Sequence, residues 1–308
     1  MHRAQRLLHH SNALPLRSYP QRRQQHATTT RRHAPRRGLH LLQHQHMKPA
    51  SPTEPPFVRY DDAEALQEEH RARFLAWKAA SHTQGQEEAV PPPRPQLLSF
   101  QARPTYTLGR RQDALTPAQA SRLTRPLAVS APHDGTSVAY TPQVKKTNRG
   151  GLTTYHGPGQ LVFWPILDMH SPLHARFGVA SYARLLETTT QALLADLFGI
   201  ETYTNPDEPG VWVGAAAGKE EERKIAALGV HHRRYVTALG VALNVHLPVA
   251  GEDEGVNPWA RFVPCGLQGK LVTSVAKETG RAQAGGEWDM NGLADMWAAR
   301  FEEGLLKG

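Results

Sequence analysis

The segment RGGLTTYHGPGQLVFWPI, residues 149–166, constrains the fold of this chain more than any other. Its first eleven residues contain four glycines and one proline, and a run of apolar side chains follows at once. Glycine loses more conformational entropy on folding than other residues, so a cluster this dense is expected where the backbone turns sharply or approaches another group closely. The run LVFWPIL at 161–167 is typical of a buried strand. We therefore predict a loop that closes over a ligand and leads into a core strand.

The residues of this loop match neither of the common nucleotide-binding motifs, so they leave its ligand open. The loop lacks the Gly-Lys-Ser/Thr ending of a P-loop, and it does not follow the dinucleotide pattern of spaced glycines. Arg149 could pair with an acidic group or a phosphate on a substrate. His156 is a second candidate, although a single histidine in a loop is more often structural or exposed than catalytic.

Apolar periodicity predicts the secondary structure. Helical spacing is clearest at 61–80, 181–197 and 289–305, and Gly199 is expected to end the second of these helices. Short apolar runs at 210–214, 224–230 and 237–247 predict further strands, whereas the polar segment 111–148 has little periodicity. Strands that alternate with few long helices favour an α/β (α+β) fold, a mixed β-sheet with packed helices.

Charge divides the chain at about residue 53. Residues 1–53 contain nine arginines, one lysine and no acidic residue, although the whole chain carries a net charge of +8. The folded part, 54–308, therefore lacks the basic excess expected of a nucleic-acid-binding domain. The leader resembles a mitochondrial transit peptide in composition, and a disordered basic tail is the alternative. No apolar run approaches the ~20 residues that cross a bilayer, so we expect no membrane-spanning segment.

The single cysteine, Cys265, is a candidate nucleophile. A lone cysteine is by default a small hydrophobic residue, but the sequence PCGL places this one on irregular backbone between strands, where reactive groups tend to lie. A nucleophilic thiol needs a neighbour that favours the thiolate. Lys224, at the start of KIAALGV, could supply that charge or shuttle a proton, or it could be the last exposed residue before a strand. No Cys/His spacing indicates zinc.

Taken together, several segments resemble one known family. RGGLTTYHGPGQLVFWPI, DEPGVWVG, KIAALGV, TALGVALNV and PCGLQGKLVTSV occur in the order found in lipoyl(octanoyl) transferases, the octanoyl-[acyl-carrier-protein]:protein N-octanoyltransferases, here of the eukaryotic mitochondrial type. The resemblance covers about residues 57–302. It implies the catalytic-domain fold shared with biotin and lipoate ligases, and a monomeric enzyme of the mitochondrial matrix.

The resemblance also implies a reaction. An octanoyl (or lipoyl) group passes from acyl-carrier protein to a lysine on the lipoyl domains of 2-oxoacid dehydrogenase complexes and of glycine-cleavage H protein, with no cofactor and no metal. Cys265 matches the cysteine that accepts the acyl group, and Lys224 matches the lysine that tunes it. The substrate-binding positions implied are Arg149, Gly150, Gly151, Leu152, Thr153, Thr154, Tyr155, His156, Ala227, Leu228, Gly229, Gly240, Val241 and Ala242.

Two departures from the family pattern keep alternatives open. Leu239 stands where the family usually has histidine, and the charged insertion AAAGKEEER, 215–223, precedes Lys224 directly. An ATP-dependent lipoate ligase on the same fold is one alternative, but it would be indifferent to Cys265. A weakly active module that binds carrier protein is the other alternative, and Leu239 is the feature that favours it.

Overall fold

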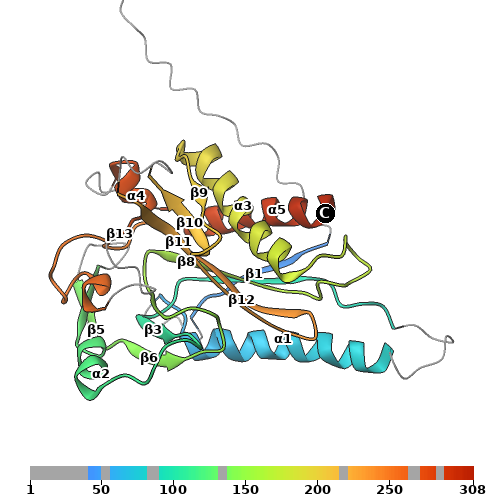
Figure 1. Ribbon diagram of the computed structural model, residues 1–308, viewed down its shortest axis with the longest axis horizontal. Coiled ribbons are helices and arrows are strands. Elements are labelled where there is room, and N and C mark those ends of the chain that lie inside the picture. Colours follow the sequence, from blue (N-terminus) through green and yellow to red (C-terminus); the bar gives the residue numbers. More distant parts are fainter. Residues whose placement is uncertain are drawn as a thin grey trace, which may run out of the picture. The chain divides into compact units, whose positions relative to one another are not determined.

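One mixed sheet dominates the computed structural model, which describes residues 41–49, 56–81, 90–130, 137–214, 221–262, 271–281 and 288–308. Eight strands of these ranges form the sheet (Figure 1). In spatial order they are β1 (Gln43–His46), β2 (Gln96–Phe100), β8 (Gln160–Ile166), β12 (Val236–Asn244), β11 (Arg223–Arg233), β10 (Gly210–Val213) and β9 (Tyr203–Thr204), with β13 (Leu271–Val272) beside β11. Strands β1 and β13 pair in parallel and the others antiparallel, which confirms the predicted mixed sheet.

Helices and two smaller sheets complete the described part of the fold. The helices are α1 (Tyr60–Ser81), α2 (Pro117–Leu123), α3 (Val179–Phe198), the 3-10 helix η1 (Pro258–Arg261), α4 (Val275–Glu278) and α5 (Met290–Lys307). The smaller sheets are β6 (Gln143–Lys146), β3 (Thr105–Leu108) and β7 (Thr153–His156), and the pair β4 (Leu127–Ser130) and β5 (Ser137–Tyr140). None of the helices in the described ranges has the length and apolarity that crossing a membrane requires.

Strand β8 shows why helices cover both faces of the main sheet. Successive side chains of a strand point to opposite faces. Leu161 and Phe163 belong to the apolar core formed with α3 and α5, whereas Val162 and Trp164 belong to the core formed with α1. The sequence LVFWPI is therefore apolar throughout because both of its faces are buried.

The hairpin of β11 and β12 crosses the centre of this sheet. Every residue of β12 is buried, and the register pairs Gly229 with Gly240. The turn residues Arg234 and Tyr235 both have positive φ, 51° and 67°, as a two-residue hairpin turn that matches the strand twist requires.

The N-terminal limit of the folded part corrects the expected boundary at residue 53. Strand β1 pairs in parallel with β2, and Leu41 and Leu42 are buried. Their backbone N–H groups donate to the Glu302 carboxylate on α5 at 2.5 and 2.7 Å. Residues 41–49 are thus part of the folded domain. They form an edge strand of the main sheet and supply the hydrogen bonds to the buried Glu302 carboxylate. The remainder of the predicted transit peptide, residues 1–40 and 50–53, lies outside the described residues.

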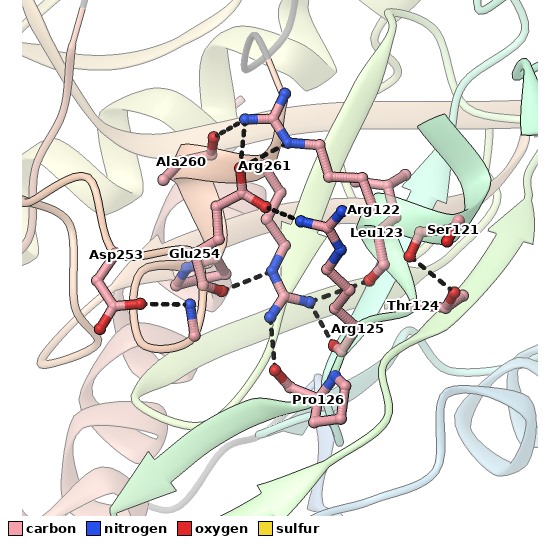
Figure 2. A network of polar contacts seen from close by, with 12 residues as sticks. Ser121, Arg122, Leu123, Thr124, Arg125, Pro126, Asp253, Glu254, Ala260 and Arg261 are labelled. Carbon is pink, nitrogen blue, oxygen red and sulfur yellow. Dashed lines mark hydrogen bonds and ion pairs between the residues drawn. The ribbon is translucent and has the colours of Figure 1, made fainter. Parts of the chain in front are cut away.

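Arg261 anchors η1 to the segment that follows α2. Its side chain is almost fully buried, and the guanidinium donates to the main-chain oxygens of Leu123, Arg125, Pro126 and Glu254 at 2.6–3.2 Å (Figure 2). Four carbonyl acceptors fix the orientation of a planar guanidinium tightly. The chain is therefore held firmly just before residues 263–270, which lie outside the described residues and include Cys265.

Candidate active site

A cavity of about 30 Å³ lies between the first residue of α1, strand β7 and the central strands β8, β11 and β12. Polar groups line one part of it and apolar side chains line the rest. Its lining residues are Tyr60, Arg149, Thr154, His156, Val162, Trp164, Ala227, Leu228, Gly229, Leu239, Gly240, Val241 and Ala242.

The structure brings most of the predicted substrate-binding residues to this cavity. Three segments that are far apart in the sequence meet there: the loop with strand β7, the middle of β11 and the middle of β12. The predicted residues that line the cavity are Arg149, Thr154, His156, Ala227, Leu228, Gly229, Gly240, Val241 and Ala242.

Five predicted residues do not line the cavity: Gly150, Gly151, Leu152, Thr153 and Tyr155. Alternation along β7 accounts for the last two, because Thr154 and His156 take the face toward the cavity and their neighbours take the other face. On that other face, Thr153 donates its hydroxyl to the Gln112 side chain at 2.7 Å, and the Tyr155 ring packs 5.2 Å from that of Tyr106. Both residues stabilise the loop from behind.

Four lining residues were not predicted to bind substrate: Tyr60, Val162, Trp164 and Leu239. The first three come from α1 and from the apolar run of β8, where nothing in the sequence separates a cavity wall from ordinary core. Leu239 differs from these three because it stands at a position where the resembled family usually has histidine. It has a left-handed backbone, φ 60°, and its N–H donates to the Gln67 side chain of α1 at 2.6 Å.

Arg149 is a buried cation at the cavity. Its Nε donates to Thr107 Oγ1 at 3.1 Å, and its Nη1 donates to the Gly150 carbonyl at 3.0 Å. The stem of this arginine lies against β11, where a Cβ on Gly229 would come within 2.8 Å of its Cδ. Glycine at that position therefore makes room for the arginine.

His156 is buried and neutral at physiological pH. Burial and the nearby Arg149 guanidinium lower its pKa from 6.5 to about 4. Its Nδ1 lies 2.8 Å from Gln160 Oε1, and its ring centroid lies 5.7 Å from that of Tyr60. Burial also raises the pKa of Tyr60 well above its usual value, so the cavity holds a neutral imidazole beside a neutral phenol.

The glycines of the HGPG segment have an intramolecular role. A Cβ on Gly157 would lie 2.0 Å from the Tyr155 hydroxyl, and one on Gly159 would lie 2.7 Å from the Leu247 nitrogen. Gly159 also has a φ of 84°, a backbone conformation that residues other than glycine rarely adopt. Neither glycine lines the cavity, and the space a side chain would need at each is filled by the protein itself.

Lys224 is buried near one end of β11 and does not line the cavity. Its Nζ donates to the Pro209 carbonyl at 3.2 Å and lies 4.5 Å from the centroid of the Trp212 ring. This is not the exposed strand-end lysine of the alternative interpretation. The backbone of Lys224 also pairs with Val272 of β13, at the point where the chain returns from residues 263–270. Cys265 itself lies outside the described residues.

The described residues contain no group of three or more histidine, cysteine, aspartate or glutamate side chains that could hold a metal ion. The polar groups at the cavity are a guanidinium, a neutral imidazole, a phenol and a threonine hydroxyl. Such a set can donate hydrogen bonds to a carbonyl and accept one from an amine.

Comparison with known proteins gives consistent matches. The family model for the lipoyl protein ligase A/B catalytic domain matches residues 75–302. The mitochondrial octanoyl-[acyl-carrier-protein]:protein N-octanoyltransferase LIPT2 of Danio rerio is 38% identical over 185 residues, which is 60% of this chain and 68% of that protein. A probable octanoyltransferase of Schizosaccharomyces pombe is 35% identical over 223 residues, 71% of this chain and 81% of that protein. The solved structure of P. falciparum LipL1 with lipoate aligns at 12% identity and a TM-score of 0.48, over 86% of this chain and 62% of that one, which is too weak to add to the sequence matches.

Proposed function

Because the chain belongs to the lipoyl protein ligase A/B catalytic-domain family, we propose that it is an octanoyltransferase, an acyltransferase that acts in protein lipoylation. In this proposal an octanoyl group passes from acyl-carrier protein to a lysine on a lipoyl domain. The observation that carries the proposal is that Arg149, Thr154 and His156 meet the glycine-containing segments of β11 and β12 at one cavity.

The proposed chemistry is nucleophilic catalysis in two steps. The Cys265 thiolate attacks the carbonyl carbon of the carrier thioester, a new thioester forms, and the carrier thiolate leaves. The neutral amine of the incoming lysine then attacks this acyl-enzyme, an amide forms, and the Cys265 thiolate leaves. The carrier thiolate takes up one proton and the attacking amine releases one, so Lys224 needs only to carry that proton between the steps.

Lys224 is suited to this role by its burial. Its Nζ is held away from bulk solvent by the Pro209 carbonyl and the Trp212 ring. In its charged form it would favour the thiolate of a cysteine brought close to it. Strand β13 brings the end of the segment that carries Cys265 beside Lys224, which supports this pairing.

The acyl chain would enter the apolar part of the cavity and lie against the face formed by β8 and β12. The present volume of about 30 Å³ corresponds to roughly two water molecules, so the lining side chains must move to admit eight carbons. Each methylene that becomes buried contributes about 0.8 kcal/mol, which offsets the cost of that movement.

We further propose that the protein acts as a monomer in the mitochondrial matrix and that residues 1–40 contain its transit peptide. The acid-free composition of this leader and the similarity to a mitochondrial relative support the location. Its acyl acceptors would be the lipoyl domains of 2-oxoacid dehydrogenase complexes and glycine-cleavage H protein.

Intact-protein mass spectrometry tests the proposed function. The protein without residues 1–37 is incubated with octanoyl-acyl-carrier protein and no ATP, beside Cys265→Ala and Lys224→Ala. We expect an octanoyl adduct on the parent protein that hydroxylamine removes, no adduct on Cys265→Ala, and slow formation on Lys224→Ala. Transfer that occurs only with ATP and free octanoate would instead identify an ATP-dependent ligase.

A further inference from the structure

A chain of buried side-chain hydrogen bonds runs from His156 into the protein. His156 Nδ1 lies 2.8 Å from Gln160 Oε1, Gln160 Nε2 donates to Asn244 Oδ1 at 2.9 Å, and Asn244 Nδ2 donates to the Thr273 carbonyl at 3.0 Å. Gln160 Nε2 also donates to the Tyr155 carbonyl at 3.1 Å. The three side chains come from β7, β8 and β12, and each is at least 94% buried.

The two main-chain carbonyl groups in this chain of bonds dictate its direction. A carbonyl oxygen can only accept, so the Asn244 amide must turn its NH₂ toward Thr273 and its oxygen toward Gln160. The Gln160 amide must then turn its NH₂ toward Asn244 and Tyr155, which leaves its oxygen facing His156. An oxygen cannot donate, so the proton of the neutral imidazole must be on Nδ1.

We infer that Gln160 and Asn244 are positioning residues that hold His156 in one tautomer, with a bare Nε2, so that this nitrogen accepts a hydrogen bond from the incoming lysine amine. This inference rests on the proposed octanoyltransferase function and specifies how its second step is oriented. Of the two groups that react in that step, only the amine carries an N–H. The thioester carbonyl can only accept.

A second polar atom at the cavity complements this assignment. Thr154 is on the same face of β7 as His156, is 3% exposed, and its hydroxyl has no partner within the described part of the chain. A hydroxyl can donate to the thioester carbonyl while Nε2 accepts from the amine. A buried polar group without a partner is costly, so a ligand that satisfies this hydroxyl is favoured.

The surroundings of His156 keep it an acceptor rather than a base. Arg149 from the loop before β7 and Tyr60 from α1 are the charged and titratable groups that face it, and the residues from β8 and β12 are uncharged amides. With a pKa of about 4, the imidazole does not hold a proton at pH 7. It can therefore orient the lone pair of the amine toward the carbonyl, while the proton that the amine loses passes to Lys224, as in the proposed two-step reaction.

The tautomer can be observed without any assay of activity. Long-range ¹H–¹⁵N NMR of protein labelled on histidine distinguishes an N–H on Nδ1 from one on Nε2. We expect Nδ1–H for His156 in the wild type, and a mixed or Nε2–H signal in Gln160→Met, which removes the acceptor. A wild-type signal from an Nε2–H imidazole would overturn the inference.

Gln160→Glu supplies the kinetic test. A carboxylate beside Nδ1 raises the pKa of His156, so both nitrogens become donors near pH 7. We expect formation of the acyl-enzyme to stay within about twofold of the wild type, and transfer to the lipoyl domain to fall at least tenfold at pH 7 and to recover as pH rises. The matched control is Gln191→Glu, since Gln191 also donates to a main-chain carbonyl, that of Thr202 at 3.0 Å, but on α3 away from the cavity.

The outcomes separate this inference from the proposed function. If the wild type takes up no octanoyl group, the proposed function fails, whatever the variants do. If the wild type acylates and transfers but Gln160→Glu transfers equally fast from pH 6 to 9, the function stands and the role of His156 as acceptor is refuted. Should Gln160→Glu fail to fold, the wild-type and Gln160→Met spectra still decide the tautomer.

Discussion

The two faces of the main sheet are built differently. The face covered by α3 and α5 is a continuous apolar core in which Phe163, Trp297 and Phe301 stack on one another. The face covered by α1 and β7 also encloses the cavity, and the polar side chains buried there include Gln67, His156 and Gln160. Apolar packing tolerates no cavity without loss of stability, whereas buried polar groups must each find a partner or a ligand. We therefore assign stability to the first face and chemistry to the second.

The largest effect is expected on the apolar face. Trp297 is fully buried, stacks 4.3 Å from Phe163, and donates its indole N–H to Thr190 Oγ1 at 3.0 Å. Trp297→Ala should lower the free energy of unfolding by about 3–5 kcal/mol, because it leaves a cavity and removes the hydrogen bond from the indole to Thr190. Urea denaturation followed by circular dichroism measures this loss, with Trp77→Ala, a partly exposed site on α1, as the control that should lose less.

The comparison between the faces also predicts what Trp297→Ala leaves unchanged. The rate of octanoyl transfer per folded molecule of Trp297→Ala should equal that of the wild type at a temperature where both proteins are folded. A lower rate per folded molecule would mean that the α3 and α5 face contributes to the chemistry, and the division between the faces would be wrong.

A smaller loss of stability, joined by a change in activity, is expected on the other face. Gln67 accepts the N–H of Leu239, a cavity residue held with φ 60°. Gln67→Met keeps the volume but leaves a buried N–H without its acceptor, so the free energy of unfolding should fall by about 1–3 kcal/mol. The same change releases Leu239 into the cavity, so KM for octanoyl-carrier protein should rise. Unchanged stability and KM together would show that the contact is dispensable.

The smallest effect, counted per pH unit, is a dependence of stability on pH. The folded-state pKa of His156, about 4, lies below the value near 6.5 of an unfolded histidine, so the unfolded chain binds the proton more tightly. The contribution of neutral His156 to the free energy of unfolding is fully present above pH 6.5 and is lost as the pH falls toward 4. Within that window His156 should contribute a slope of at most ~1.4 kcal/mol per pH unit.

Urea denaturation of wild type and His156→Asn at pH 6.5, 5.5 and 4.5 isolates this slope. Other histidines with lowered pKa, such as His44 and His246, contribute equally to both proteins. The variant should therefore lose stability less steeply than the wild type as the pH falls. Parallel curves for wild type and His156→Asn would contradict the burial argument.

Long periodic elements could be predicted from the sequence, and short ones could not. The helices expected at 61–80, 181–197 and 289–305 are confirmed as α1, α3 and α5, because amphipathic spacing repeats over several turns in each. The segment 111–148 instead contains α2, β4, β5 and β6, which the sequence did not indicate. Strands of four residues that are partly exposed are too short for an alternating pattern to stand out.

The leader shows a second limit. Residues 41–49 share the basic, acid-free composition of the residues before them, so composition placed the boundary at residue 53. The pairing of β1 with β2 and the contact of its N-terminal end with Glu302 depend on residues far along the chain. Amino-acid composition indicates whether a segment tends to be ordered by itself. It does not indicate that a distant strand or carboxylate will bind that segment in the fold.

By itself the sequence determined the class of fold, the segments that carry chemistry and their order along the chain, because periodicity and residue type are local properties. Only the tertiary structure decided that Thr154 and His156, rather than Thr153 and Tyr155, face the cavity, because alternation fixes which residues share a face and not which face is turned inward. It alone also joined Gln160 to Asn244, 84 positions apart, and so fixed which nitrogen of His156 carries the proton. That assignment follows from two main-chain carbonyl oxygens that can only accept, and their position exists only in the folded chain.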